Sequence, residues 1–345
     1  MEQATAIPAT RSVADEQQSQ GRERMSDAPG LCPVCGSQSF ILEESVTDPW
    51  FGYPGAWRYD RCSSKKCGIA HIANPLTPEK LAEAYGNYYT HSASPPDKIE
   101  VALGRWINRR NRHHGDKFPS LPFLFREAEY RILLSGAVPS SKQKVALDVG
   151  CGSGERLDYL SKIGWGTALG VDPDPIAVAN GKRAGRQLLL GSAENIPMDD
   201  NSVDIIFLHH VVEHLWEVRP ALTEAKRVLR QGGHVVIATP NLDSANRRKW
   251  GRWWRGYEAP RHLRLYTLSA MQDALRDTGF GIHLARCSAR AAPAWDRESA
   301  RASGTDNSSK LFGWWQEDRK VLRGNASLLA GNHDGDELLV VGKVI

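Results

Sequence analysis

Long hydrophobic segments are missing from this chain of 345 residues. No run approaches the ~20 consecutive apolar residues that a membrane-spanning helix needs, and the polar residues 1–30 lack the apolar centre of a secretory signal. We therefore expect a cytoplasmic protein. A strong charge of one sign is missing too. The 44 basic and 40 acidic residues leave a net charge of +4, which is too small to indicate a nucleic-acid partner.

Cysteine is scarce, and six in the whole chain exclude a scaffold built on disulfides. Four of them nevertheless form two close pairs, Cys32 with Cys35 and Cys62 with Cys67, each followed directly by glycine. Two such pairs fit the four ligands of a tetrahedral zinc ion, and a metal replaces a core that ~45 residues can hardly build. We predict a structural zinc site on these cysteines. Free or disulfide-paired thiols are the alternative.

Composition divides the chain into four segments. Residues 1–30 are polar without any apolar period, which predicts a disordered tail, and Met25 is an alternative start. Residues 31–75 form the cysteine module, residues 76–143 a helical linker region, and residues 144–345 the larger domain.

The linker region contains two predicted helices separated by a polar, basic stretch. Thr77–Tyr89 has Thr77 as an N-cap and Pro78 at the first helical position. His91–Pro122 is the polar stretch, and Phe123–Ser135 is amphipathic.

From Lys144 onward, short apolar strands alternate with helical stretches, which predicts a parallel sheet covered on both faces and hence an α/β fold. The predicted strands are Val145–Val149, Ala168–Asp172, Gln187–Leu190, Val203–His209, His234–Thr239, Phe280–Ala285 and Glu337–Val344. The predicted helices are Gly154–Lys162, Pro175–Ala184 and Arg219–Leu229.

The most informative segment is the glycine loop after the first of these strands, where Gly150, Gly152 and Gly154 alternate with other residues. Glycine lets the backbone approach a ligand closely, and ligands bind beyond the carboxyl ends of parallel strands. Asp148 before the loop and Glu155 after it would repel a diphosphate but suit a cationic ligand. A tight turn with capping acids is the alternative.

The glycine spacing separates this loop from other nucleotide-binding loops. It is G-x-G-x-G, not the G-x-G-x-x-G of dinucleotide sites, and no G-K-[ST] of a phosphate loop is present. Asp172 ends the next strand, where an acid can accept hydrogen bonds from both hydroxyls of a ribose.

Five motifs in order resemble the class I S-adenosylmethionine (SAM)-dependent methyltransferases. They are Leu147–Gly154, Gly170–Asp172, Gly191–Pro197, Asp204–Ile206 and the turn Leu229–Gly233. The resemblance implies a seven-stranded Rossmann-like sheet whose last strand, Glu337–Val344, is antiparallel. Together with the cysteine module and the stretch from Asn74 to Tyr89, it extends over residues 31–345.

The resemblance also implies a set of residues that bind SAM. The acid Asp172 would bind the ribose, and the stretch Ser192–Glu194 would lie beside the adenine. The predicted SAM-binding residues are Asp148, Gly150, Cys151, Gly152, Gly154, Asp172, Pro173, Ser192, Ala193, Glu194 and His209.

The candidates for catalysis follow the fourth strand. If Val211–Leu215 is helical, His210, Glu213 and His214 share one face, and His262 is a further candidate. Two functional interpretations remain open, a general base and a divalent metal that holds the acceptor. Quinone-biosynthesis and small-RNA 2′-O-methyltransferases resemble this chain in an acid-x-x-Glu-His motif that binds metal, although His210 replaces the first acid here. A third interpretation is that Glu213 and His214 merely pair.

The segment Asn246–Tyr266 is basic and aromatic, and it follows the fifth strand, where this fold commonly shapes the acceptor pocket. Tryptophan and arginine can bind sugars, rings or anionic groups. A lid that packs its tryptophans inward is the alternative.

We therefore predict a SAM-dependent methyltransferase that acts at an oxygen of a small molecule or glycan. An RNA methyltransferase that recognises RNA through the zinc module is the second hypothesis, favoured by basic stretches at Arg105–His114 and Arg247–Arg264. A non-enzymatic SAM-binding protein is the third.

Overall fold

The computed structural model describes residues 29–86, 143–162, 164–288, 292–305 and 333–345. The predicted stretch His91–Pro122, the predicted helix Phe123–Ser135 and all but the end of the predicted tail lie outside these residues. None of the described helices is long and apolar enough to cross a membrane.

A seven-stranded sheet forms the larger part of the molecule, with the strand order β10-β11-β8-β7-β4-β5-β6. Neighbouring strands from β8 to β6 are parallel, whereas β11 is antiparallel to both β8 and β10. The antiparallel last strand confirms the prediction. The strands are β4 (Val145–Val149), β5 (Thr167–Asp172), β6 (Leu188–Leu190), β7 (Val203–His209), β8 (Leu229–Pro240), β10 (Phe280–Ser288) and β11 (Glu337–Val344).

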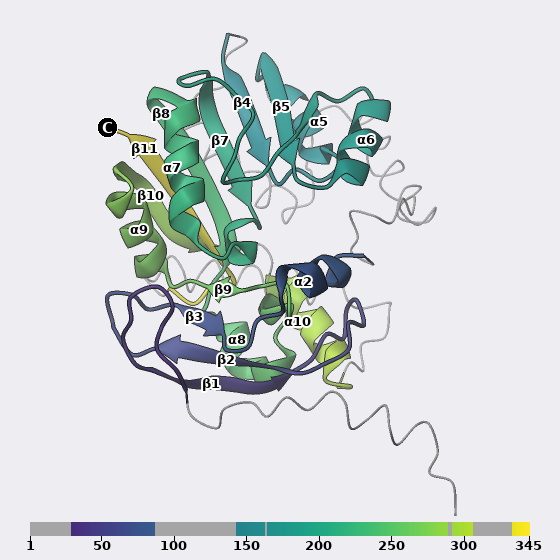
Figure 1. The fold of residues 1–345 in the computed structure, drawn as a ribbon, viewed down its shortest axis with the longest axis vertical. Coiled ribbons are helices and arrows are strands. Elements are labelled where there is room, and N and C mark those ends of the chain that lie inside the picture. Colours follow the sequence, from purple (N-terminus) through teal and green to yellow (C-terminus); the bar gives the residue numbers. More distant parts are fainter. Residues whose placement is uncertain (1–28, 87–142, 163, 289–291, 306–332) are drawn as a thin grey trace, which may run out of the picture.

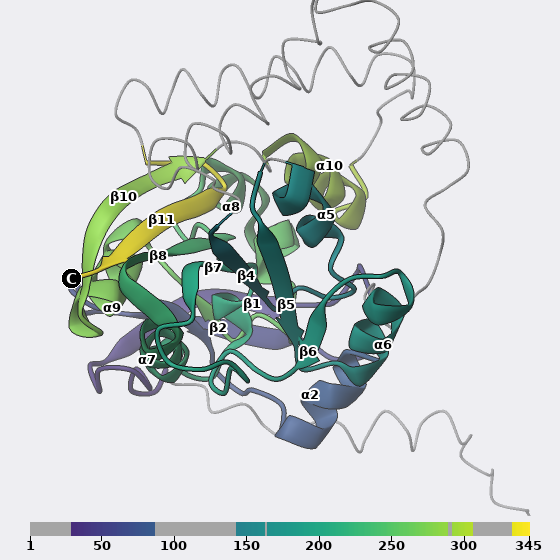
Figure 2. The same ribbon diagram turned by 90° about the horizontal axis from the view of Figure 1, so that it is seen from above.

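Helices cover both faces of this sheet and create two separate hydrophobic cores. Figure 2 shows α7 and α9 on one side and α5 on the other. Leu222 of α7 and Met271 of α9 belong to one core, and Leu160 of α5 belongs to the second. The helices are α5 (Glu155–Lys162), α6 (Pro175–Arg183), α7 (Val218–Val228) and α9 (Leu268–Asp277). The central strands are therefore buried on both faces, which explains their continuous apolar runs.

A second sheet of four strands lies below the carboxyl ends of the parallel strands (Figure 1). Its strands are β1 (Ser39–Val46), β2 (Trp57–Cys62), β3 (Ala70–Ile72) and β9 (Arg264–Leu265). The cysteine module supplies the first three, and the fourth comes from a segment about 190 residues later that directly follows His262. The module therefore shares a sheet with the inserted segment, a pairing that the sequence did not indicate.

The inserted segment after β8 folds into short helices packed on the second sheet. They are α8 (Ala245–Trp250), η2 (Gly251–Trp253) and η3 (Arg255–Tyr257), and α10 (Ala292–Ala302), which follows β10, packs against them. Trp254 and Tyr257 are fully buried in a third core, together with Tyr59 of β2. The alternative of a lid that packs its tryptophans inward holds for Trp254, whereas Trp250 and Trp253 are only partly buried.

Two local predictions differ from the structure. Helix α2 (Pro78–Ala84) has Thr77 as its N-cap, as predicted, but it ends at Ala84, well before Tyr89. The predicted turn Leu229–Gly233 lies inside β8, where the register against β7 shifts between Val203 and Ile205. The positive φ of Gly232, 75°, accommodates this irregularity without a separate turn.

Candidate functional site

The glycine loop connects β4 to α5 with all three glycines in the left-handed region, at φ 70°, 56° and 83° for Gly150, Gly152 and Gly154. A Cβ atom on Gly150 would lie 2.5 Å from the side chain of Val211. Another residue at this position would therefore be strained and would also collide with the segment that follows β7. The loop thus keeps backbone close to the carboxyl edge of the sheet.

Asp172 at the end of β5 joins the glycine loop to the next strand. Its Oδ2 accepts a hydrogen bond from the Gly152 amide at 2.7 Å, and its Oδ1 accepts one from the Asp174 amide at 2.9 Å. The carboxylate is 7% exposed. Three features that the sequence predicted for one site therefore meet here: the loop, the acid, and the strand ends.

The two acids that flank the loop differ in their surroundings. Asp148 is buried, and burial raises the pKa of its carboxyl to about 6 although Arg156 lies 3.3 Å away. Glu155 is exposed and accepts a hydrogen bond from Ser153 Oγ at 2.6 Å. Arg186 donates to the Ser153 carbonyl at 2.8 Å and thereby fixes the outer side of the loop, a contact that the sequence did not indicate.

Helix α7 holds the residues that directly follow the predicted adenine-side stretch Ser192–Glu194. Glu224 accepts a hydrogen bond from the Ile196 amide at 2.9 Å, and Arg227 donates to the carbonyls of Ile196 and Met198 at 3.0 Å each. Neither helix residue carried a signal in the sequence, because the contacts span about 30 positions.

His210 lies between two buried carboxylates just beyond β7. Its Nδ1 is 2.9 Å from Glu213 Oε1, and its Nε2 is 3.0 Å from Glu337 Oε1 on β11. Burial alone would lower the pKa of His210, but these hydrogen bonds raise it to about 9. Burial likewise opposes ionisation of Glu213, yet the bond from His210 lowers its pKa to about 2. Both ring nitrogens of His210 therefore act as donors of an imidazolium.

The predicted helix Val211–Leu215 is instead a short 3-10 helix, η1 (Val212–His214), and His210 precedes it with φ 56°. His210 and Glu213 still meet, as predicted, but His214 points to a different group of residues. Glu213 pairs with His210 and accepts from Thr239 Oγ1 at 2.9 Å. The donor atoms of Glu213 and His214 lie within 4.8 Å of one another, so the pairing of these two side chains stays a prediction.

His214 and His262 form a second group below β7. Their rings are 4.7 Å apart, edge to face. Nδ1 of His262 donates to the Gly256 carbonyl at 2.8 Å, and Nδ1 of His214 lies 3.2 Å from the Arg261 carbonyl and 2.8 Å from the Tyr85 hydroxyl of α2. Burial lowers the pKa of His262 to about 4, so this ring is neutral at pH 7. His214 is the more accessible of the two.

Metal-binding geometry is present at the four cysteines. Their sulfurs all lie within 4.8 Å of one another, with Cys32 and Cys67 3.8 Å apart and Cys35 and Cys62 3.4 Å apart. A tetrahedral zinc ion with Zn–S bonds of 2.3 Å requires sulfur separations of about 3.8 Å. The residues therefore fit a zinc ion, and no cysteine of the described residues forms a disulfide.

Two further groups have donor atoms within 4.8 Å of one another: Glu213 with His214 and His262, and His209 with His210 and Glu337. In the first group, the Nδ1 atoms of both histidines face backbone carbonyls. Such bonds orient ring nitrogens for a metal, so this group fits a divalent ion. In the second, both nitrogens of His210 are engaged by carboxylates.

Two arginines of the inserted segment, Arg255 and Arg261, form ion pairs inside the protein. Arg261 is fully buried and 2.6 Å from Asp48 of the cysteine module, and Arg255 contacts Glu258 and Glu298. The positive charges of Arg255 and Arg261 are therefore already paired with carboxylates and do not provide a binding site for an anionic acceptor.

A family model described as a methyltransferase domain matches residues 147–237. An uncharacterized 37.1 kDa protein of a Streptomyces fradiae transposon is 33% identical over 122 residues, covering 33% of this chain and 35% of that protein. A malonyl-[acyl-carrier protein] O-methyltransferase from Serratia marcescens is 32% identical over 149 residues, covering 41% and 55%. A Mycolicibacterium smegmatis protein named "Probable S-adenosylmethionine-dependent methyltransferase" is 33% identical over 97 residues, covering 28% and 37%.

The match covers the glycine loop, Asp172 and the segment after β7. It supports the methyltransferase class predicted for the larger domain, and the sheet of seven strands agrees with the Rossmann-like fold expected there. The chain spans between about a third and a half of the length of these relatives, so the acceptor of the whole protein is a separate question.

Proposed function

We propose that this methyltransferase transfers the methyl group of SAM to an oxygen atom of a small molecule or glycan. The observation that carries the proposal is the arrangement at the carboxyl edge of the sheet: the glycine loop and Asp172 on one side, and His214 beyond β7 on the other. One of the relatives is named an O-methyltransferase, which supports oxygen as the acceptor atom.

SAM would occupy the edge formed by β4, β5 and β7. The glycine loop would approach the methionyl part, Asp172 would accept the ribose hydroxyls, Ser192–Glu194 would border the adenine, and His209 would lie near the sulfonium. Buried Asp148 adds negative charge below the loop. This charge suits a cationic sulfonium better than a diphosphate.

The reaction is an in-line displacement. The acceptor oxygen forms a bond to the methyl carbon while the bond from sulfur to carbon breaks, and S-adenosylhomocysteine leaves with the electron pair. A hydroxyl acceptor must also lose its proton, and an imidazole in hydrogen-bond reach can take it.

His214 is the best candidate for this base. His210 has both nitrogens engaged by carboxylates and so has no lone pair to accept a proton, and His262 is 4% exposed. His214 is more accessible, and its ring is oriented by the Arg261 carbonyl and the Tyr85 hydroxyl.

A divalent metal on Glu213, His214 and His262 is the second candidate, favoured by the proximity of their donor atoms. A metal there would act as a Lewis acid that lowers the pKa of an acceptor hydroxyl. In that case the Nδ1 contacts of both histidines would serve to hold the rings in place.

The test separates binding from transfer. His214→Gln should retain SAM binding by calorimetry but lose transfer of a tritiated methyl group to fractionated cell extract by ~10²–10⁴-fold. His283→Gln, an exposed histidine on β10, is the matched control. Full activity of His214→Gln would overturn the role of His214. Failure of the wild-type protein to bind SAM would overturn the whole proposal.

The same assay distinguishes the remaining alternatives. If a metal acts at this site, dialysis against EDTA should abolish methyl transfer, and Mg²⁺, Mn²⁺ or Zn²⁺ should restore it. Methyl transfer that persists after EDTA would indicate a base. The zinc content is measured in each sample. Labelled product that is lost on RNase treatment would indicate RNA as the acceptor, and loss on glycosidase treatment would indicate a glycan.

A further inference from the structure

Arg264 of β9 is a buried cation that forms no ion pair with an Asp or Glu in the part of the chain that the structure describes. The residue is 7% exposed, its Nη1 donates to the neighbouring Leu263 carbonyl at 3.1 Å, and its Nε has no hydrogen-bond partner among the described residues. Arg261, three positions earlier, is equally buried but lies 2.6 Å from Asp48. A buried charge is costly unless an opposite charge compensates it. Among the described residues, no Asp or Glu forms an ion pair with Arg264 that would compensate this charge.

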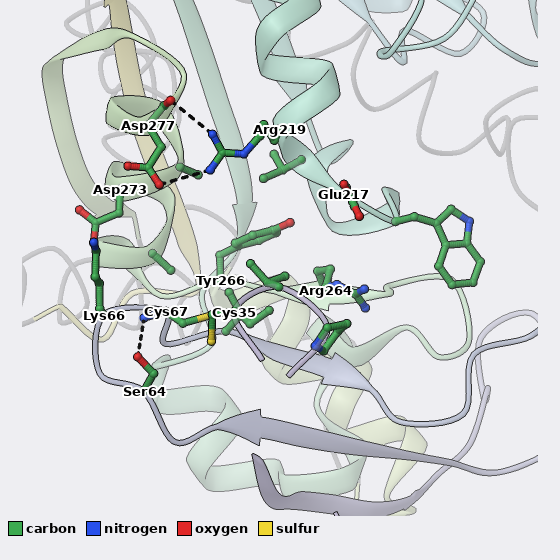
Figure 3. Close-up of a pocket in the computed structure, with 17 residues that line it drawn as sticks. Cys35, Ser64, Lys66, Cys67, Glu217, Arg219, Arg264, Tyr266, Asp273 and Asp277 are labelled. Carbon is green, nitrogen blue, oxygen red and sulfur yellow. Dashed lines mark hydrogen bonds and ion pairs between the residues drawn. The ribbon is translucent and has the colours of Figure 1, made fainter. Parts of the chain in front are cut away.

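The surroundings of Arg264 indicate which anion compensates its charge. Arg264 lines a cavity of about 360 Å³ between the cysteine module and helices α7 and α9 (Figure 3). Cys35, Cys67, Glu217 and Tyr266 line it too. Burial lowers the pKa of Arg264, and the Tyr266 phenol, the Cys32 thiol, the Glu217 carboxylate and the Cys67 thiol oppose this shift.

Three of these groups are poor counter-ions in the metal-free protein. Tyr266 is a phenol whose pKa is raised by burial, and the thiols of Cys32 and Cys67 carry no charge while protonated. Glu217 is exposed and forms no ion pair with Arg264 in the described residues, so water screens its charge. Four thiolates around a divalent ion, in contrast, leave a net charge of −2.

We propose that Arg264 is the counter-cation of the four-cysteine metal centre and that its charge contributes to metal affinity. The buried guanidinium offsets part of the −2 charge of the zinc–thiolate group, and the group in turn compensates the buried guanidinium. Each therefore stabilises the other.

The proposal links the metal to the segment that carries His262. Residues His71 and Ala70 of β3 pair with Arg264 and Leu265. The Tyr59 hydroxyl of β2 donates to the His262 carbonyl at 2.8 Å, and the Leu263 amide donates to the Glu213 carbonyl at 2.8 Å. Loading of the metal would thus order β9 and, through it, the backbone between His262 and Glu213.

Zinc affinity of the full chain tests the proposal without any methyl-transfer assay, so it can fail independently of the proposed function. Competition with a chromophoric chelator should show that Arg264→Met weakens zinc binding by about 10-fold to 100-fold, the usual effect of removing a group that supports metal ligands. Arg264→Lys should retain most of the affinity, because it keeps the charge.

Two controls line the same cavity. Arg219→Met removes an exposed arginine that pairs with Asp277, and Glu217→Gln removes the rival counter-ion. Both should bind zinc like the wild type. Wild-type affinity in Arg264→Met, or an equal loss in Glu217→Gln, would overturn the proposal.

A second measurement addresses the charge directly. Cys35→His keeps four ligands but makes the centre one unit less negative, so Arg264→Met should cost less zinc affinity in that background than in the wild type. An equal cost in both backgrounds would contradict the charge-based role. Arg264→Gln replaces the Met variant if that variant does not fold. Hydrogen exchange at the Leu263 amide should also quicken when zinc is removed, and unchanged exchange would exclude the link to β9.

Discussion

A histidine enclosed by two carboxylates differs from a free imidazole in charge and in role. His210 contacts Glu213 and Glu337 through its two nitrogens, and both glutamates are buried. The sequence presented His210, Glu213 and His214 as one group. Only the structure separates His210, which holds the end of β7 to β11, from His214, which faces α2.

The charge of His210 predicts how stability depends on pH. The folded pKa of about 9 lies above the ordinary 6.5, so the contribution of His210 is fully present below pH ~6.5 and is lost as the pH rises through 9. The folded pKa of Glu213, about 2, lies below the ordinary 4.5, so its contribution is lost as the pH falls toward 2. His210→Gln should therefore lower the free energy of unfolding by ~3 kcal/mol near pH 6.

Urea denaturation of both proteins at pH 6 and pH 9.5 checks this expectation. The difference between His210→Gln and the wild type should be smaller at the higher pH. A difference that does not change with pH would show that His210 contributes by packing alone.

Asp172 is the residue whose removal should affect the cofactor most. Asp172→Ala should weaken SAM binding by ~1–3 kcal/mol, the usual cost of deleting a charged hydrogen-bond partner. Asp199→Ala, an exposed acid after the adenine-side stretch, is the control. Calorimetry gives both affinities, and a thermal melt shows whether the glycine loop still folds. Equal affinities would rule out the assignment of Asp172.

At the level of elements, the sequence was most informative where contacts are local. Val203–His209 and Glu337–Val344 were predicted with the bounds that the structure has, because alternation of apolar runs with helices marks buried strands. The cap Thr77 followed from neighbouring residues alone. The four cysteines could be grouped because their spacing reflects short turns at Gly36 and Gly68, both at positive φ.

Contacts between distant parts of the chain were not predictable in this way. The pairing of β3 with β9 and the contact of His210 with Glu337 join residues that are 127 or more positions apart. No local pattern marks Glu337 or Arg264 as different from other residues of a strand. The hydrogen bond between Tyr85 and His214 could not be predicted either, because these residues are 129 positions apart in the sequence.

The cysteine module predicts one zinc ion per chain. Elemental analysis of the purified protein should find one equivalent, and Cys62→Ser should lose it together with thermal stability, because metal binding contributes directly to folding of such sites. Cys287→Ser, on β10 and away from the cluster, should retain it. Zinc retained by Cys62→Ser would contradict the four-ligand assignment.

For the molecule as a whole, the cysteine module and the inserted segment are joined by a buried ion pair. Arg261 and Asp48 are both fully buried, 2.6 Å apart, and Arg261 also donates to the Ala84 carbonyl of α2. Asp48→Asn should lower the free energy of unfolding by ~3–5 kcal/mol, because it leaves an uncompensated buried guanidinium.

An ion pair between an arginine and an aspartate at the surface provides the comparison for the buried pair of Arg261 and Asp48. Arg248 and Asp334 are 3.8 Å apart at the surface, and Asp334→Asn should change the unfolding free energy by less than ~1 kcal/mol. Urea denaturation of both variants measures the two costs. Similar losses in the two variants would mean that the Arg261–Asp48 pair adds nothing beyond a surface contact.

The shared second sheet also determines what a shortened protein would look like. The family match begins at Leu147, yet a fragment cut near that position would lose three strands and leave Leu263 and Leu265 on a bare, apolar edge. Unpaired edges of this kind promote aggregation. The part of this chain that matches the methyltransferase domain is therefore not an independent unit, and exchange of the amino-terminal module would also require changes in the distant segment that completes the second sheet.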